Sequence, residues 1–352
     1  MTLEPPDLRP TSQAQYRAST GGTLPPFELI RDGIGAVAVP VGMGNVPYTF
    51  CYLIEDAHGA LHVLDPGDNL AEGWALLMSA MAAMGRRVSD VATITVTHFH
   101  PDHLAIAERL RAESGARLAL HPLEVEEIKA VLSAHGGDAR NAQLISWGVP
   151  EDGRTLMLQF QGATGFRGVE PDYLIEEGSV IDAPGRTLLI RHTPGHTPGH
   201  ICLQIEDEQL FLSGDHVIPT VVPGIGLGIG VPGGGAIDGY LASLADIEKL
   251  DAYEVLPGHG FRFRGLASRA RFIRDHHLTR TREVSVILEQ QPDLSVWEVA
   301  RQLTWTATWE GLSTMFRFSA LAQTSMHMDF VVSGRAEPYL GGEPSSLAPV
   351  AP

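Results

Sequence analysis

The sequence predicts an α/β protein in which two β-sheets pack face to face between outer helices, an αββα sandwich, followed by a small helical domain. Two observations support this fold class. Short apolar, β-branched segments of strand length gather at residues 34–97 and 179–214, and segments with helical periodicity flank both groups. Beyond residue 265 the periodicity is helical. The chain has 352 residues, 44% of them hydrophobic, which is enough to bury the core that such a fold needs.

Apolar periodicity and turn residues place the individual elements. Strands are expected at 36–41, 49–55, 61–65, 91–97, 117–121, 179–182, 186–192, 201–206, 209–214 and 254–256. Helices are expected at 71–84, 104–113, 124–132, 240–250, 267–290, 296–303 and 313–330. Ser295 and Glu298 form the capping-box pattern that opens the helix at 296. Residues 136–170 contain several glycines and are expected to form an irregular cap beside the functional site.

Four side chains able to bind metal lie within the hexad His98-Phe99-His100-Pro101-Asp102-His103, directly after the strand expected at 91–97. If the strand extends to residue 100, His98 and His100 point to the same side of it, because side chains alternate along a strand. Pro101 then ends the strand, and Asp102 takes the N-cap position of the next helix. Asp102 and His103 thereby turn back toward the same pocket. Imidazole and carboxylate groups are ligands of zinc, manganese and iron, so the hexad predicts a metal site.

Three further polar residues follow apolar strands in the second half of the chain. His196 lies in a Gly/Pro turn after the strand expected at 186–192, Asp215 follows the strand at 209–214, and His259 lies in Pro-Gly-His-Gly. Loops at the carboxyl ends of strands carry the ligand-binding residues of many α/β proteins. We therefore expect these three residues to meet the hexad at one edge of the sheets.

These motifs, in this order, resemble those of the metallo-β-lactamase-fold hydrolases over roughly residues 30–265. The resemblance implies two divalent metal ions, with zinc favoured and manganese or iron as alternatives. It implies that His98, His100 and His196 hold the first ion, that Asp102, His103 and His259 hold the second, and that Asp215 bridges them. Asp65, in the segment that corresponds to the first motif of the family, would support the ligands from outside. His200, like His216, is expected to support the site or its loops and not to bind metal.

The domain boundaries follow from these patterns. Residues 1–27, rich in Pro, Ser and Thr, are expected to form an extended N-terminal arm, and residues 28–265 the catalytic domain. Residues 266–337 would form three helices and a short β-wing at 331–335, which resembles the winged-helix tail of a subgroup that includes an endoribonuclease and fungal polyketide thioesterases. Residues 338–352 are expected to be a flexible tail.

Two segments are candidates for substrate binding. The glycine-rich run 223–235 contains a formal GxGxxG pattern, but it follows no clean strand and Pro232 interrupts the turn, so a dinucleotide site is not expected. An apolar wall of the substrate pocket, including Gly226 and Gly228, fits its composition better. Residues 262–282 contain seven Arg and one Asp. Arg269 and Arg271 could bind a phosphate-bearing substrate, or this stripe could form surface ion pairs with the acidic body.

The function expected from these features is hydrolysis of an ester-type bond, a thioester or lactone in preference to others, by a hydroxide shared between the two metals. Asp102 would orient or transfer a proton, which makes it the candidate catalytic side chain. A phosphodiesterase or endoribonuclease using the same metals is the alternative. β-Lactam hydrolysis is disfavoured, because lactamases whose second zinc takes a cysteine would have it near position 215, where this chain has Asp215.

Composition indicates the partners and the compartment. A formal charge of −17 argues against a protein that coats nucleic acid. A small acyl substrate, which could be linked to coenzyme A, agrees better with this composition. Cys51 and Cys202 lie in apolar strands and are expected to be reduced. We find no signal-peptide pattern and no apolar run of membrane-spanning length, so the sequence predicts a cytoplasmic protein without a membrane partner. A homodimer is left open.

Overall fold

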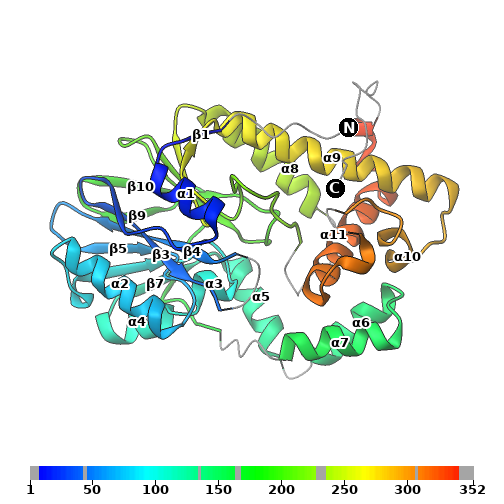
Figure 1. The fold of residues 1–352 in the computed structure, drawn as a ribbon, viewed down its shortest axis with the longest axis horizontal. Coiled ribbons are helices and arrows are strands. Elements are labelled where there is room, and N and C mark those ends of the chain that lie inside the picture. Colours follow the sequence, from blue (N-terminus) through cyan, green and yellow to red (C-terminus); the bar gives the residue numbers. More distant parts are fainter. Residues whose placement is uncertain are drawn as a thin grey trace.

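Two β-sheets packed face to face form the centre of the structure, a computed structural model that describes residues 8–42, 46–133, 136–162, 168–226, 235–305 and 308–340 (Figure 1). Within these residues each sheet has seven strands. The first sheet has the order β2 (Glu28–Arg31), β3 (Ile34–Pro40), β4 (Tyr48–Glu55), β5 (Leu61–Leu64), β6 (Val91–Thr95), β7 (Arg117–Leu120), β8 (Tyr173–Leu174). The second has the order β1 (Arg9–Pro10), β14 (Phe263–Arg264), β13 (Glu254–Pro257), β12 (Leu210–Gly214), β11 (Ile201–Ile205), β10 (Arg186–His192), β9 (Val180–Ala183).

The inner faces of the two sheets share one hydrophobic core. Phe50 of β4 lies in the same buried cluster as Leu188 of β10 and Leu203 of β11. Strands β3 and β4 are buried on both faces, because helices cover the outer side of their sheet. Near-continuous apolar strands are the expected consequence of this double coverage. The predicted αββα sandwich is confirmed.

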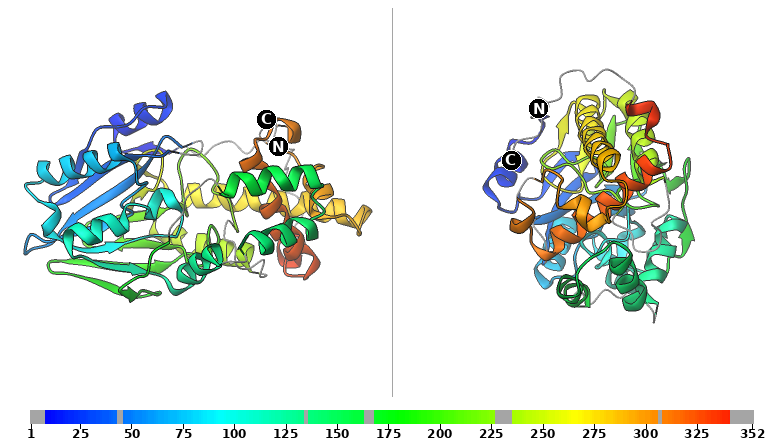
Figure 2. Two further views of the ribbon diagram at one scale, coloured as in Figure 1. Left: turned by 90° about the horizontal axis from the view of Figure 1, so that it is seen from below. Right: turned by 90° about the vertical axis from the view of Figure 1, so that its right-hand side faces the viewer.

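Helices cover the outside of each sheet, as Figures 1 and 2 show. Leu77 of α2 (Ala71–Ala83), Leu110 of α4 (Ala107–Ser114) and Ile128 of α5 (Pro122–Leu132) are buried in the core outside the first sheet. On the second sheet, Leu244 of α8 (Ala236–Ile247) and Ile273 of α9 (Leu266–Gln290) are buried in a separate core. The short helix α3 (Pro101–Leu104) and the 3-10 turns η1 (Val88–Asp90) and η2 (Glu248–Leu250) connect these elements.

A helical region lies beside the sandwich and combines segments from two parts of the chain. It contains α10 (Val296–Ala300), η3 (Trp309–Gly311), α11 (Thr314–Val332), α12 (Glu337–Leu340), and also α6 (Gly136–Ser146) and α7 (Glu151–Gly162). The expectation of an irregular cap at 136–170 was therefore wrong for most of that segment. Leu144 and Trp147 are buried against residues of α10 and α11, and this apolar contact stabilises helices that the glycine content alone did not predict.

Two expectations for the ends of the chain need correction. The arm is not extended throughout, because Ser12 caps helix α1 (Gln13–Gly21) and β1 joins the second sheet; residues 1–7 lie outside the described part. The β-wing does not form at 331–335. Helix α11 continues to Val332, and the Ala336 N–H then donates to the Phe330 carbonyl in the turn before α12. The capping box of Ser295 and Glu298 is confirmed. Of the expected tail, residues 341–352 lie outside the described residues.

Parallel strand pairs bring the predicted ligand loops to one edge of the sandwich. β5 pairs with β6 and β12 pairs with β13 in parallel, so the carboxyl ends of each pair lie side by side. The hexad follows β6, Asp215 follows β12 and His259 follows β13, while His196 lies in the loop between β10 and β11. In the described parts of the chain we find no helix that is long and apolar enough to cross a membrane.

Candidate metal centre

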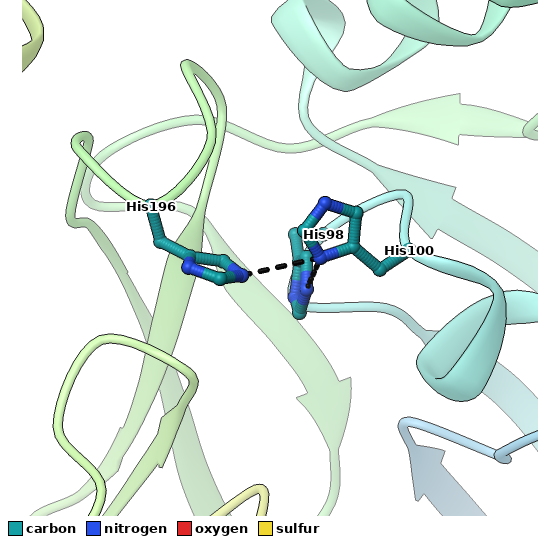
Figure 3. Close-up of side chains that lie close together, drawn as sticks. All are labelled: His98, His100 and His196. Atoms are coloured by element: carbon teal, nitrogen blue, oxygen red, sulfur yellow. Dashed lines mark hydrogen bonds between the residues drawn. The ribbon is translucent and has the colours of Figure 1, made fainter. Parts of the chain in front are cut away.

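Three histidines from two loops converge at the sheet edge. His98 and His100 come from the turn after β6, and His196 comes from the loop after β10 (Figure 3). The Nδ1 atom of His100 lies 2.8 Å from His98 Nε2 and 3.1 Å from His196 Nε2. The three rings therefore direct one nitrogen each toward a common point, and these atoms are close enough together to hold one metal ion.

A second group lies directly beside the first. The ligand atoms of Asp102, His103 and His259 also lie within 4.8 Å of one another. Asp215 joins the two groups: its Oδ1 is 3.5 Å from His103 Nε2 and 3.2 Å from His259 Nε2, and its Oδ2 is 3.6 Å from His196 Nε2. The structure thus brings together all seven residues that the sequence singled out as ligands.

The outer nitrogen of each buried ring has a partner that fixes the ring. His98 Nδ1 lies 3.0 Å from the Thr97 hydroxyl, and His103 Nδ1 lies 2.8 Å from Asp65 Oδ2. His196 Nδ1 donates to the Gly224 carbonyl and His259 Nδ1 donates to the Tyr48 carbonyl, both at 2.8 Å. A carbonyl can only accept, so in the last two rings Nδ1 carries a proton, and Nε2 is the nitrogen that faces the centre and would bind a metal.

Burial and neighbouring charges divide the histidines into two classes. Burial lowers the pKa of His98 and His196, and it lowers the pKa of His100 to about 3, so these rings are neutral at neutral pH. Burial opposes charge on His259 as well, but Asp215 and Asp102 outweigh it and raise its pKa to about 10. For Asp102, burial is likewise outweighed, here by His103 and His259, and the pKa of the carboxyl is lowered.

Two buried atoms at the centre lack the partners that they need. Neither His103 Nε2 nor Asp215 Oδ1 has a hydrogen bond, although both are shielded from solvent. A buried polar atom without a partner is costly, and a cation between a nitrogen lone pair and a carboxylate would satisfy both atoms at once. The donor set of imidazoles and carboxylates suits zinc, manganese or iron. The residues therefore fit a metal pair.

Asp65 and His200, which were expected to support the ligands, both contact a ligand residue, Asp65 through the ring of His103 and His200 through the backbone of Asp215. Asp65 is buried, and its backbone adopts the left-handed conformation with φ of 51°. Its carboxylate accepts hydrogen bonds from the backbone N–H and the hydroxyl of Thr97 and also contacts His103. His200 Nε2 accepts from the Asp215 backbone N–H at 3.1 Å. His216 is buried and its ring contacts Tyr240, so it lies behind the centre.

The local structure around the hexad differs from the expectation in two details. β6 ends at Thr95, so His98 and His100 lie in a turn and not on an extended strand end. His100, and not Asp102, is the N-cap residue of α3, and Asp102 follows Pro101 inside the helix. In this turn the Phe99 N–H donates to the Glu124 carboxylate at 2.7 Å, which helps to hold the turn in place.

Sequence reasoning missed two residues of the site. Thr49 donates from Oγ1 to Asp102 Oδ2 at 3.1 Å, and a threonine among the apolar and aromatic residues of β4 was the available signal. Glu124 is fully buried and accepts the N–H groups of Phe99 and Gly199, at 2.7 and 2.6 Å. Burial raises the pKa of Glu124 to about 7. Through these two hydrogen bonds the carboxyl connects the two histidine loops, and its position in the first turn of α5 did not indicate this role.

The proposed substrate-binding residues have mixed outcomes. Gly226 lies beside the centre, where its N–H donates to the Gly195 carbonyl, whereas Gly228 lies outside the described residues. Arg269 is only 3% exposed and donates to two backbone carbonyls. Arg271 is half exposed and pairs with Glu248. Both arginines therefore have protein partners in this structure, Arg271 in an ion pair of the kind expected as the alternative, and phosphate binding by them stays a prediction.

The comparisons with known proteins agree with this geometry. The profile of the metallo-beta-lactamase superfamily matches residues 44–259. The chain belongs to the metallo-beta-lactamase superfamily. It is therefore a metal-dependent hydrolase of that superfamily.

Individual members of the superfamily show how far the similarity extends. A probable metallo-hydrolase of Bacillus subtilis is 26% identical over 309 residues, which is 85% of this chain and 92% of that protein. An acyl-coenzyme A thioesterase of Bos taurus is 31% identical over 164 residues, 44% of this chain and 53% of that protein. A beta-lactamase domain protein from Burkholderia ambifaria has a similar fold, with a TM-score of 0.75 at 20% identity over 93% of each chain.

Proposed function

We propose that this hydrolase cleaves a thioester or lactone of a small acyl substrate with a pair of divalent metal ions, zinc in preference to manganese or iron. The ligands would be His98, His100, Asp102, His103, His196, Asp215 and His259. The observation that carries the proposal is the position of Asp215, whose two oxygens lie 3.2 to 3.6 Å from histidines of both groups. One carboxylate in that position can serve two ions.

The chain's own groups hold and orient the reactants. When bound, the ions lower the pKa of water to about 7 and polarise the carbonyl oxygen of the substrate. The side chain of Asp102 is 22% exposed, whereas the side chains of His103 and His259 beside it are at most 6% exposed. Asp102 is therefore the group that a substrate can reach. Thr49 holds its Oδ2 atom, so Oδ1 is the atom that would orient water or receive a proton.

An acyl substrate is favoured over a phosphodiester for two reasons. The alternative depended on a free arginine stripe and on a β-wing, yet residues 331–335 form no strand. Each of the seven arginines has a partner within the described structure: Arg262, Arg271, Arg274 and Arg280 form ion pairs, and Arg264, Arg269 and Arg282 donate to carbonyls. The similarity to an acyl-coenzyme A thioesterase supports the acyl reading further.

A substrate panel tests the proposal. The zinc-loaded protein would be assayed on an acyl-coenzyme A, an acyl lactone, nitrocefin and an RNA oligonucleotide. We expect release of free thiol or opening of the lactone, and loss of this activity in His196→Ala. His58→Ala, a change of an exposed histidine outside the site, is the matched control and should keep the parent rate. Cleavage of RNA without turnover of either acyl substrate would overturn the proposal.

A further inference from the structure

The loop that follows Asp215 connects the metal centre with the C-terminal helices. Its described part reaches residue 226. Val217 and Ile225 of this loop are fully buried, and they belong to the same hydrophobic core as Ile273 of α9 and Met326 of α11. The described part of the loop is therefore packed against the C-terminal helices.

Arg269 of α9 holds this loop at two points. Its Nε donates to the Ile218 carbonyl at 2.7 Å, and its Nη2 donates to the Val221 carbonyl at 2.6 Å. In the part of the chain that the structure describes, no carboxylate forms an ion pair with it. A buried charge without a counter-ion is costly and is tolerated only with good hydrogen bonds. Burial lowers the pKa of Arg269 to about 10, so the guanidinium is still charged at neutral pH.

The far end of the same loop contacts the ligand His196. The Gly224 carbonyl accepts from His196 Nδ1 at 2.8 Å, and the Gly226 N–H donates to the Gly195 carbonyl at 2.8 Å. Gly226 has φ of +65°, and a Cβ atom there would lie 2.8 Å from Cγ of Met326. The side chains of Arg269 and Met326 thus contact a loop whose Gly224 carbonyl accepts a hydrogen bond from His196.

We infer that Arg269 is a positioning residue for the metal centre. By fixing the loop at residues 218 and 221, it keeps the Gly224 carbonyl where it sets the tautomer and orientation of His196. The hydrogen bond from a ligand histidine to its outer partner typically contributes 10- to 100-fold to metal affinity. The inference rests on the proposed metal site and assigns the C-terminal helices a role in it.

The test is a zinc titration against a chromogenic chelator, with the parent and Arg269→Met compared. We expect the ion bound through His196 to be held about 10- to 100-fold more weakly in Arg269→Met, while the ion bound through His259 keeps its parent affinity. Arg282→Met is the matched control, because Arg282 lies on the same helix and also donates to a carbonyl, that of Tyr339. It should leave both affinities unchanged.

A loss confined to one ion distinguishes positioning from a purely structural role, which would weaken both ions together with the thermal midpoint. If Arg269→Met does not fold, Arg269→Lys is the variant that tests the inference. Lysine keeps the charge but lacks the planar guanidinium that donates to two carbonyls. Its loss should be smaller and confined to the same ion. Parent that binds no zinc would refute the proposed function itself. Parent that binds two ions, with unchanged affinities in the variant, would refute only the role of Arg269.

Discussion

At the scale of single residues, the position of His259 in the second group gives a direct prediction. His259→Ala should lower the metal content from two ions to one per chain, because His98, His100 and His196 still form a complete group. Elemental analysis after dialysis measures this, with His58→Ala as the control. A variant that keeps both ions, or loses both, would contradict the assignment of His259 to one ion only.

Asp102 is the second residue whose role can be measured. In Asp102→Asn the carboxylate is replaced by an amide of similar shape that cannot take up a proton. We expect turnover of the fully metal-loaded variant to fall about 10²–10⁴-fold, the usual contribution of a general acid or base. Thr49→Val removes only the hydrogen bond to Asp102 and should cost less. Parent-like turnover by metal-loaded Asp102→Asn would leave Asp102 with a structural role alone.

At the scale of elements, buried histidines between α9 and α11 make the stability of their contact depend on pH. His277 and His327 stack at 5.8 Å, and Thr281 contacts His327 Nδ1 at 2.9 Å. Burial, with the charge of Arg280 adding to it, lowers the pKa of both rings well below the ordinary value of 6.5. The neighbouring His276 is affected similarly, with its pKa lowered to about 4.

The lowered pKa values of these histidines determine how the stability of the protein changes with pH. Below pH 6.5 these histidines take up protons in the unfolded chain but remain neutral in the folded protein. Their contribution to the free energy of unfolding is therefore fully present above pH 6.5 and is lost as the pH falls. Each histidine can add a slope of about 1.4 kcal/mol per pH unit. His277→Phe should flatten this fall in urea unfolding, and the comparison with the parent cancels the contribution of the metal ligands. Equal slopes in both proteins would contradict the prediction.

At the scale of the whole molecule, the helical region should unfold together with the sandwich. Helices α6 and α7 belong to the first half of the chain but share a core with α10 and α11, and α9 packs on both α8 and α11. Four of the five tryptophans lie in this region: Trp147, Trp297, Trp305 and Trp309. Tryptophan fluorescence and far-UV circular dichroism should therefore report one common transition.

A pair of leucine variants tests that coupling. Leu144 is fully buried in the shared core, and Leu144→Ala should lower the free energy of unfolding by about 2–5 kcal/mol and shift both signals equally. Leu156 on α7 is 56% exposed, so Leu156→Ala should change the free energy of unfolding by no more than about 0.5 kcal/mol. Two separate transitions would show that the helical region is an independent unit.

The sequence by itself determined the sandwich and predicted which residues meet at the candidate metal centre. Strand periodicity predicted β3, β4, β10 and β11 to within about two residues, because burial of these strands requires a local apolar pattern that can be read directly. The hexad, His196, Asp215 and His259 were recognisable because each follows a strand in a short Gly- or Pro-containing turn. Such signals are local, and a single segment contains all of the information.

Only the tertiary structure decided the roles that depend on contacts between distant segments. Glu124 bridges two histidine loops through backbone N–H groups that lie 25 and 75 residues away, and no local pattern encodes such partners. Arg269 was expected either to bind a phosphate or to form a surface ion pair, but its side chain is buried and its donors point to the loop after Asp215. Residues 136–162 form helices because a distant apolar surface stabilises them. In each case the deciding free energy comes from burial between elements, which a linear sequence does not display.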